Sequence, residues 1–252
     1  VTVSATAAGV GTTPASVEVI FDFELTLEPS NMFLPEPTKY DGLNTEAILV
    51  AKANGVTISV PDGDLQFDAD DESIASVDSN GSVSGRGSAG NISSITANYH
   101  GKTASSTVEI LPLNYSSGYG FSDSAGGTGE FVPQASNNYT AELHCGEIVD
   151  AIGGVGNLSA PVKYVTSTNL ISSVNVEWGV YQSSKRALTM ITFNYSDGRS
   201  PVVCGMGNVD VSGVTRDTYT VPSGEVFNGF YVKSDVTSGF ASYVEFNSYE
   251  KR

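Results

Sequence analysis

The sequence predicts an all-β protein, and three observations support this class. Short runs of alternating apolar and polar residues recur along the chain, whereas apolar residues at the helical spacing i, i+3, i+4 and i+7 are almost absent. Gly, Asn, Asp and Ser separate these runs, as β-turns require. With 252 residues, 40% of them hydrophobic, each half of the chain is long enough to bury a core of its own.

The alternating runs predict ten strands. In chain order they are Val17–Leu27, Thr45–Ala51, Ile74–Val77, Ile95–Tyr99, Ser106–Leu111, Val162–Val165, Val174–Trp178, Leu188–Asn194, Glu225–Val232 and Ala241–Phe246. Asn80-Gly81, His100-Gly101 and Asp197-Gly198 predict turns, because Asn and Gly tolerate the left-handed backbone of tight hairpins. Asn80-Gly81, between two β-prone runs, is a strong hairpin signal.

A change in composition near Leu111-Pro112 predicts two modules. Residues 1–111 hold 15 acidic and 4 basic residues and 6 aromatic ones, whereas residues 112–252 hold 13, 8 and 18. We therefore expect an arm at 1–18, one β-module at 19–111 and an aromatic-rich β-module at 112–252. Val1–Ala7 is a β-prone segment followed by a Gly/Thr linker, so it either returns to its own sheet or adds to the edge of a neighbour.

The first module resembles the bacterial Ig-like domain of group 2. The run Ser73–Asp78, the Asn80-Gly81-Ser82-Val83 hairpin, the Ala89-Gly90 turn, the Ile95-Thr96-Ala97 strand and Thr107–Ile110 follow one another as in that family. Leu65-Gln66-Phe67 stands where the family often has Trp, and Phe33–Asp41 looks like an insertion. The resemblance implies a non-catalytic β-sandwich used as a spacer or adhesive module on bacterial surface and phage structural proteins.

The second module resembles jacalin-type β-prism lectins more faintly, so we expect either a sandwich or a β-prism-like fold. Gly126-Gly127-Thr128-Gly129, Ile171–Gly179, Leu188–Phe193 and Val226–Ser234 follow the strand order of that family. Its sugar-binding Gly-x-x-x-Asp loop would come next. Ser238–Ser242 stands there without the Asp, so the resemblance assigns no sugar site.

The net charge of the chain excludes some classes of binding partner. The formal net charge of −16 repels nucleic acid and anionic lipid, and no apolar run is long enough to cross a membrane as a helix. We expect no nucleic-acid partner and no membrane insertion. Other structural subunits and cell-surface glycans remain as partners.

Aromatic side chains of the second module are the candidate ligand contacts, because such rings pack on sugars and on protein partners. The candidates are Tyr115, Tyr119, Tyr181 and Tyr243. Tyr115, Tyr119 and Tyr181 stand in Ser/Gly-rich segments and are expected to be exposed. Trp178 stands in an alternating strand and is expected to be buried.

Asp62, Asp64, Asp68 and Asp70 could supply oxygen ligands to calcium, although solvated loop carboxylates explain the same run. No other cofactor is expected. Gly85–Gly90 has the Gly-x-Gly-x-x-Gly spacing, but a β-branched strand follows it where a dinucleotide site needs a helix, so we expect tight turns.

The sequence offers few residues for nucleophilic catalysis. His144 and Cys145 are adjacent, so in a strand they point to opposite faces and His144 cannot readily activate Cys145. Cys145 and Cys204 are candidates for one disulfide or two buried thiols. The sequence therefore favours a non-enzymatic virion component, such as a capsid decoration, tail or fibre protein. The alternative is a secreted or cell-surface bacterial adhesin with a carbohydrate-binding second module; an enzyme such as a glycan hydrolase comes third.

Overall fold

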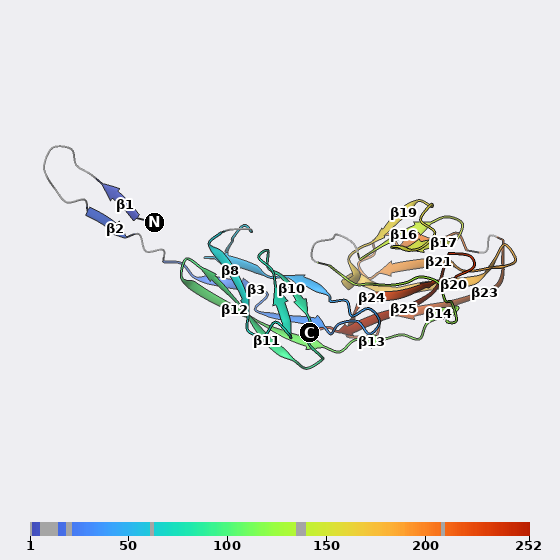
Figure 1. Cartoon of the computed structure of the whole chain (residues 1–252), viewed down its shortest axis with the longest axis horizontal. Coiled ribbons are helices and arrows are strands. Elements are labelled where there is room, and N and C mark those ends of the chain that lie inside the picture. The colour runs from blue at the N-terminus through green and yellow to red at the C-terminus, as the bar shows by residue number, and fades with distance from the viewer. Residues whose placement is uncertain (1, 6–14, 19–21, 61–62, 135–139, 208–209) are drawn as a thin grey trace.

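The computed structural model describes residues 2–5, 15–18, 22–60, 63–134, 140–207 and 210–252 (Figure 1). These residues form strands and a single short 3₁₀ helix, η1 (Thr168–Leu170), which confirms the all-β class. The described residues contain no helix that is long and apolar enough to span a membrane.

The N-terminal segment forms a hairpin of its own. Strand β1 (Thr2–Ala5) pairs antiparallel with β2 (Ala15–Glu18), with Thr2 opposite Glu18. Among the described strands it pairs with no other sheet, and Figure 1 shows it standing apart from the rest of the chain. The predicted single strand Val17–Leu27 is wrong: β2 ends at Glu18 and the next strand begins at Leu25.

The first module, taken here as strands β3 to β12, surrounds one apolar core that draws residues from Leu25 to Ile110. Its sheets have the orders β4-β12-β11-β8, β5-β10-β9 and β3-β6-β7. The strands are β3 (Leu25–Glu28), β4 (Asn31–Pro35), β5 (Glu46–Ile48), β6 (Val50–Ala53), β7 (Val56–Thr57), β8 (Leu65–Ala69), β9 (Ala75–Val77), β10 (Ser82–Gly85), β11 (Ile92–Tyr99) and β12 (Lys102–Leu111).

Two of the predicted turns are confirmed in this module. The Asn80-Gly81 hairpin joins β9 to β10, and a Cβ atom at Gly81 would collide with the carbonyl oxygen of Leu49. His100 and Gly101 both have positive φ angles, 48° and 78°, and join β11 to β12. Positive φ at both central residues suits a two-residue hairpin.

Two expectations for this module need correction. The run Thr45–Ala51 is not one strand: β5 and β6 belong to different sheets, and buried Leu49 between them bonds through its N–H to the carbonyl of Gly81 at 2.8 Å. The expected insertion Phe33–Asp41 begins inside the sheet, because Phe33 and Leu34 lie in β4, which pairs parallel with β12. The group 2 Ig-like assignment stays a prediction.

The second module, strands β13 to β25, consists of three antiparallel sheets around one core. Their orders are β13-β25-β24-β15, with β14 also on β25, then β18-β17-β16-β19 and β22-β21-β20-β23. The strands are β13 (Asn114–Tyr115), β14 (Tyr119–Gly120), β15 (Thr128–Phe131), β16 (Ala141–Cys145), β17 (Val149–Ile152), β18 (Val155–Gly156), β19 (Val162–Val165), β20 (Ile171–Tyr181), β21 (Lys185–Tyr195), β22 (Val202–Cys204), β23 (Val211–Thr220), β24 (Glu225–Ser234) and β25 (Ala241–Glu250).

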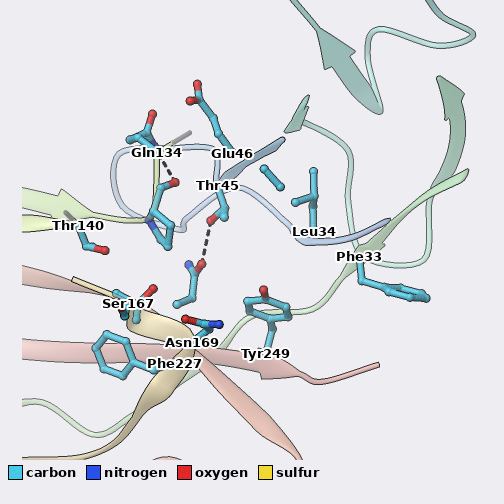
Figure 2. Close-up of a pocket in the computed structure, with 14 residues that line it drawn as sticks. Phe33, Leu34, Thr45, Glu46, Gln134, Thr140, Ser167, Asn169, Phe227 and Tyr249 are labelled. Atoms are coloured by element: carbon cyan, nitrogen blue, oxygen red, sulfur yellow. Dashed lines mark hydrogen bonds between the residues drawn. The ribbon is translucent and has the colours of Figure 1, made fainter. Parts of the chain in front are cut away.

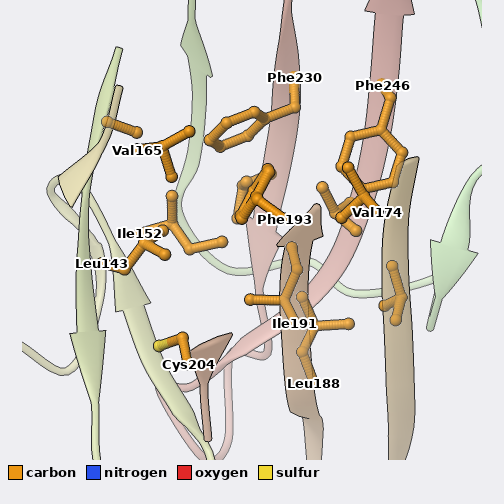
Figure 3. Close-up of a cluster of buried hydrophobic side chains, with 14 of the residues drawn as sticks. Leu143, Ile152, Val165, Val174, Leu188, Ile191, Phe193, Cys204, Phe230 and Phe246 are labelled. Carbon is orange, nitrogen blue, oxygen red and sulfur yellow. The ribbon is translucent and has the colours of Figure 1, made fainter. Parts of the chain in front are cut away.

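All three sheets turn one face to this core. Leu143 and Ile152 come from the sheet of β16 and β17, Ile191 from the sheet of β20 and β21, and Phe230 and Phe246 from the sheet of β24 and β25 (Figure 3). Three sheets that share one core form a three-sided prism rather than a two-layered sandwich. The β-prism-like alternative is therefore the better description of this module.

Cys145 and Cys204 form a disulfide, with their Cα atoms 4.9 Å apart. Cys145 ends β16 and Cys204 ends β22, so the bond joins two of the three sheets. No free cysteine is present in the chain. Of the two alternatives, a disulfide or two buried thiols, the structure therefore contains the disulfide.

Candidate functional site

The aromatic candidates do not form one exposed surface. Tyr119 and Tyr181 are only 6% and 7% exposed, so the expectation that both are exposed was wrong. Tyr119 lies on β14 and packs on Phe246 and Trp178 at ring-centroid distances of 5.5 and 6.4 Å. Trp178 itself is half-buried against the core. Short alternating strands inside the Ser/Gly-rich segment explain the error, because pairing with β25 turns the Tyr119 ring inward.

Tyr115 contacts a segment of the first module, residues 36–43, which we call the strap, and Tyr243 shares the carboxylate of Glu245 with it. The backbone N–H of Lys39 donates to the Tyr115 hydroxyl at 2.8 Å, and the Lys39 ammonium lies 4.0 Å from the Tyr115 ring centroid. Tyr40 stacks on Tyr231 with centroids 3.9 Å apart. The strap therefore covers the outer face of the sheet that contains β24 and β25.

Two buried carboxylates hold the strap in place. Glu245 accepts bonds from Lys39 Nζ at 2.5 Å, from the Tyr40 hydroxyl at 2.8 Å and from the Tyr243 hydroxyl at 3.2 Å. Glu130 accepts from the Thr38 hydroxyl and from the Asp41 backbone N–H. Burial, followed by the neighbouring Glu245, raises the pKa of Tyr243 above its ordinary value, so its hydroxyl stays a donor at neutral pH. Tyr115 is thus occupied by a contact between the modules, and the Tyr243 hydroxyl by Glu245, the carboxylate that also binds the strap.

Three loops gather at the end of the second module that points away from the first module in Figure 1. We call residues 121–127, 182–186 and 235–240 the distal loops. Arg186 Nη1 donates to Asp123 Oδ2 at 2.7 Å, and the Ser238 hydroxyl donates to the Arg186 carbonyl at 3.1 Å. Gly126 N–H donates to the carbonyl of Ser234 at 3.0 Å. These contacts join the three loops into one surface.

Tyr181 is buried beneath the distal loops and packs against one of them. Its ring packs edge-on against Phe240 at 6.1 Å, and its hydroxyl donates to Glu147 Oε2 at 2.6 Å. The bond to Glu147 and burial raise the pKa of Tyr181 to about 12. Gln182 Nε2 also donates to the Tyr181 hydroxyl at 2.9 Å. Tyr181 therefore positions the loop that follows it instead of facing a ligand with its ring.

The turn after Tyr181 carries exposed polar groups on an unusual backbone. Gln182 and Ser183 have φ angles of 47° and 64°, although neither is glycine, and both are exposed. Left-handed conformations cost such residues roughly 1–3 kcal/mol, and strain of this kind concentrates at functional positions. With Asp123 and Thr237, also exposed, the distal loops offer hydroxyl, amide and carboxylate groups to solvent.

Within the described residues, the acidic candidates do not form a metal site. Asp64, Asp68 and Asp70 are exposed, and Asp62 lies outside the described residues. Over the part of the chain that the structure describes, no group of three or more His, Cys, Asp or Glu side chains could hold a metal ion. Calcium binding stays a prediction.

His144 has structural partners, and the glycine motif lies in a turn between two strands. His144 is buried, and its ring nitrogens contact Glu142 Oε1 at 2.8 Å and the Ala160 carbonyl at 3.3 Å. Its neighbour Cys145 is in the disulfide and cannot act as a nucleophile. Gly85 ends β10, and the strand β11 follows the glycine-rich turn.

Sequence reasoning did not find the distal loops, because contacts between loops of different sheets leave no local pattern. The available signals were Gly126-Gly127 and Ser238-Gly239, quoted above for a resemblance without being assigned to a site. Gly126 packs so closely on Ser234 that a Cβ atom there would contact its carbonyl oxygen.

No family model matches the chain, and no curated protein matches it. Among solved structures, the chain is similar to the second β-prism domain of RbmC from V. cholerae, with 25% identity, a TM-score of 0.44 and coverage of 52% of this chain and 97% of that one. The structure of the same domain bound to N-acetylglucosaminyl-β-1,2-mannose has 24% identity and a TM-score of 0.45, with coverage of 53% of this chain and 98% of that one. The V. cholerae biofilm matrix protein Bap1 gives 14% identity, a TM-score of 0.46 and coverage of 86% of this chain and 47% of that one.

The chain thus spans about half the length of the Bap1 structure. All three TM-scores are below 0.5, so the prism assignment of the second module rests on its sheet topology. These likenesses give no support to the virion interpretation, which stays a prediction.

Proposed function

We propose that the chain is a non-catalytic, extracellular adhesion protein that binds carbohydrate through the distal loops of its second module. The observation that carries this proposal is the joining of three loops into one polar, free end of a three-sided prism. Loops fixed by a rigid scaffold are the usual place for ligand contacts.

The chemistry of the distal loops suits a sugar. Hydroxyl groups of sugars both donate and accept hydrogen bonds, as do the amide of Gln182 and the hydroxyl of Ser183. A carboxylate such as that of Asp123 can accept from two neighbouring hydroxyls of a sugar. Arg186 holds this carboxylate, and its bond lowers the pKa of Asp123 and keeps it ionised. Thr237 adds a further exposed hydroxyl at the same end.

The disulfide supports an extracellular location, because disulfides persist in oxidising compartments. The contacts of His144 and the bonded state of Cys145 favour a binding role over nucleophilic catalysis. The three-sheet prism also agrees with the jacalin-type resemblance of the sequence.

A glycan array with the full chain tests the proposal, with N-acetylglucosaminyl-β-1,2-mannose as the first soluble probe. We expect binding that falls tenfold or more in Gln182→Ala and Asp123→Ala, because each removes a polar contact at the proposed site. Thr215→Ala, on the exposed edge strand β23, is the control and should bind normally. Binding by both distal variants at the level of the native chain would contradict the proposal, as would the absence of binding to every glycan.

A further inference from the structure

A cavity of about 420 Å³ lies where the two modules meet (Figure 2). The first module contributes residues of β4 and β5, and the second contributes η1, β24 and β25. Its volume is within the roughly 300–1,000 Å³ of small-molecule sites. Neither the strap nor the distal loops line it.

Hydrogen bonds between the modules fix its walls. The Thr45 hydroxyl donates to Asn228 Oδ1 at 2.8 Å, and fully buried Asn228 donates in turn to Asn247 Oδ1 at 2.9 Å. Glu46 N–H donates to the Pro133 carbonyl at 3.1 Å, and Gln134 Nε2 donates to the Asn44 carbonyl at 3.0 Å. A cavity held in this way is organised before a ligand arrives, which lowers the ordering cost of binding.

The lining combines neutral polar groups with aromatic rings. Thr140 and Asn169 bring a hydroxyl and an amide, while Phe33, Phe227 and Tyr249 bring aromatic side chains. Within the described residues, the Asn169 amide and the Tyr249 hydroxyl form no hydrogen bond. Burial raises the pKa of Tyr249, so its hydroxyl is protonated at neutral pH. These groups can both donate to and accept from a ligand hydroxyl.

The charge of the lining excludes anions. Glu46 is the one charged residue among the described residues that line the cavity, and no Lys or Arg is among them. A phosphate or nucleotide would therefore find no cationic side chain among the described lining residues to pair with, and would lie near the Glu46 carboxylate. A neutral ring with hydroxyls on its edge and C–H groups on its face fits the combination of amides and aromatic rings.

We infer that this junction cavity is a second ligand site, which takes one or two residues of a neutral saccharide. A further cavity of about 240 Å³ shares Phe33, Ala47 and Tyr249 with it, but Lys251 and Arg252 line that cavity, so the proposed neutral ligand is confined to the junction cavity. The inference stands on the junction alone and does not require the distal loops to bind sugar.

Both modules supply the walls, so a bound saccharide favours the docked arrangement over a separated one. Weakening the strap should consequently weaken the junction site from a distance. Tyr40→Ala removes the stack on Tyr231 and the bond to Glu245 without touching the cavity. We expect it to lower saccharide affinity at the junction severalfold.

The test uses the full chain and the methyl glycosides of glucose, galactose, mannose and N-acetylglucosamine with their β-linked disaccharides, followed by ligand-observed NMR and calorimetry. We expect binding that falls tenfold or more in Asn169→Ala and at least threefold in Tyr249→Phe. Asn98→Ala, an exposed amide on β11, is the matched control and should bind normally. Free glycosides and an immobilised neutral polysaccharide distinguish a soluble sugar from the end of a polymer.

The distal variant Gln182→Ala separates the two sites. Saccharide binding that survives Gln182→Ala but is lost in Asn169→Ala supports the junction site whatever the distal loops do. Binding lost in Gln182→Ala and kept in Asn169→Ala overturns the junction site and leaves the distal proposal intact. If no saccharide binds, or if both variants bind like the native chain, the junction inference is wrong.

Discussion

Replacing Glu245 by Gln should weaken the contact between the two modules. The carboxylate is buried and accepts from Lys39, Tyr40 and Tyr243. Hydrogen bonds to a charged group contribute about 1.5–3 kcal/mol each, and the Gln side chain leaves at least one tyrosine hydroxyl poorly paired. The Lys39 side chain is 44% exposed, so its ion pair adds less than about 1 kcal/mol. We expect a loss of about 2–3 kcal/mol.

Trp178, the only tryptophan, lies in the second module, so its fluorescence during urea unfolding measures the free energy of unfolding there. Glu250→Gln on the same strand is the control, since Glu250 is exposed and pairs only with Arg252 in the described part of the chain. It should change stability by less than about 0.5 kcal/mol. A double-mutant cycle of Glu245→Gln with Tyr40→Phe should give a coupling of about 1 kcal/mol. Equal effects of Glu245→Gln and Glu250→Gln, or zero coupling, would refute this account of the strap.

Four further predictions follow from the structure. Phe230→Ala should destabilise the second module by about 3–5 kcal/mol in the same urea experiment, because the ring is fully buried; a cost below 1 kcal/mol would contradict the core assignment. Reducing the disulfide between Cys145 and Cys204 should cost about 4 kcal/mol for a closed loop of this length, measured as a lower melting temperature with reductant. The pKa of Tyr181, raised to about 12, contributes stability that is present below pH 10 and lost as pH rises toward 12, and Tyr181→Phe should flatten the alkaline part of the stability profile. Deleting residues 1–14 should abolish assembly with a partner while circular dichroism stays native, and full incorporation of the truncated chain would show that the hairpin is only a tail.

Local patterns in the sequence predicted the local structure. The Asn80-Gly81 and His100-Gly101 hairpins were predictable because a two-residue turn has its own backbone requirement. The runs at Glu225–Val232 and Ala241–Phe246 lie within the longer strands β24 and β25, since alternation marks one buried face.

Contacts between distant segments could not be predicted in this way. Nothing around Tyr119 shows that it will pair with β25 and turn its ring inward. Phe33–Asp41 looks like an insertion in the sequence, and nothing local shows that the strap, which it overlaps, contacts Glu130 and Glu245, 87 or more positions further along the chain. Tyr115, which was expected to be exposed because of its Ser/Gly-rich segment, consequently lies at a contact between the modules, against Lys39.

The position of the N-terminal hairpin bears on how tightly a surface that carries many copies of this chain would adhere to glycans. Figure 1 shows the hairpin at one extreme of an elongated chain, with the distal loops at the other. If the distal loops bind carbohydrate as proposed, copies fixed through their hairpins would point these loops outward together, so a glycan surface would meet many sites at once. Linked sites of this kind gain effective concentration, and avidity can exceed single-site affinity by about 10²–10⁴. The spacing of neighbouring copies would then govern the strength of adhesion, even if each individual sugar contact were brief.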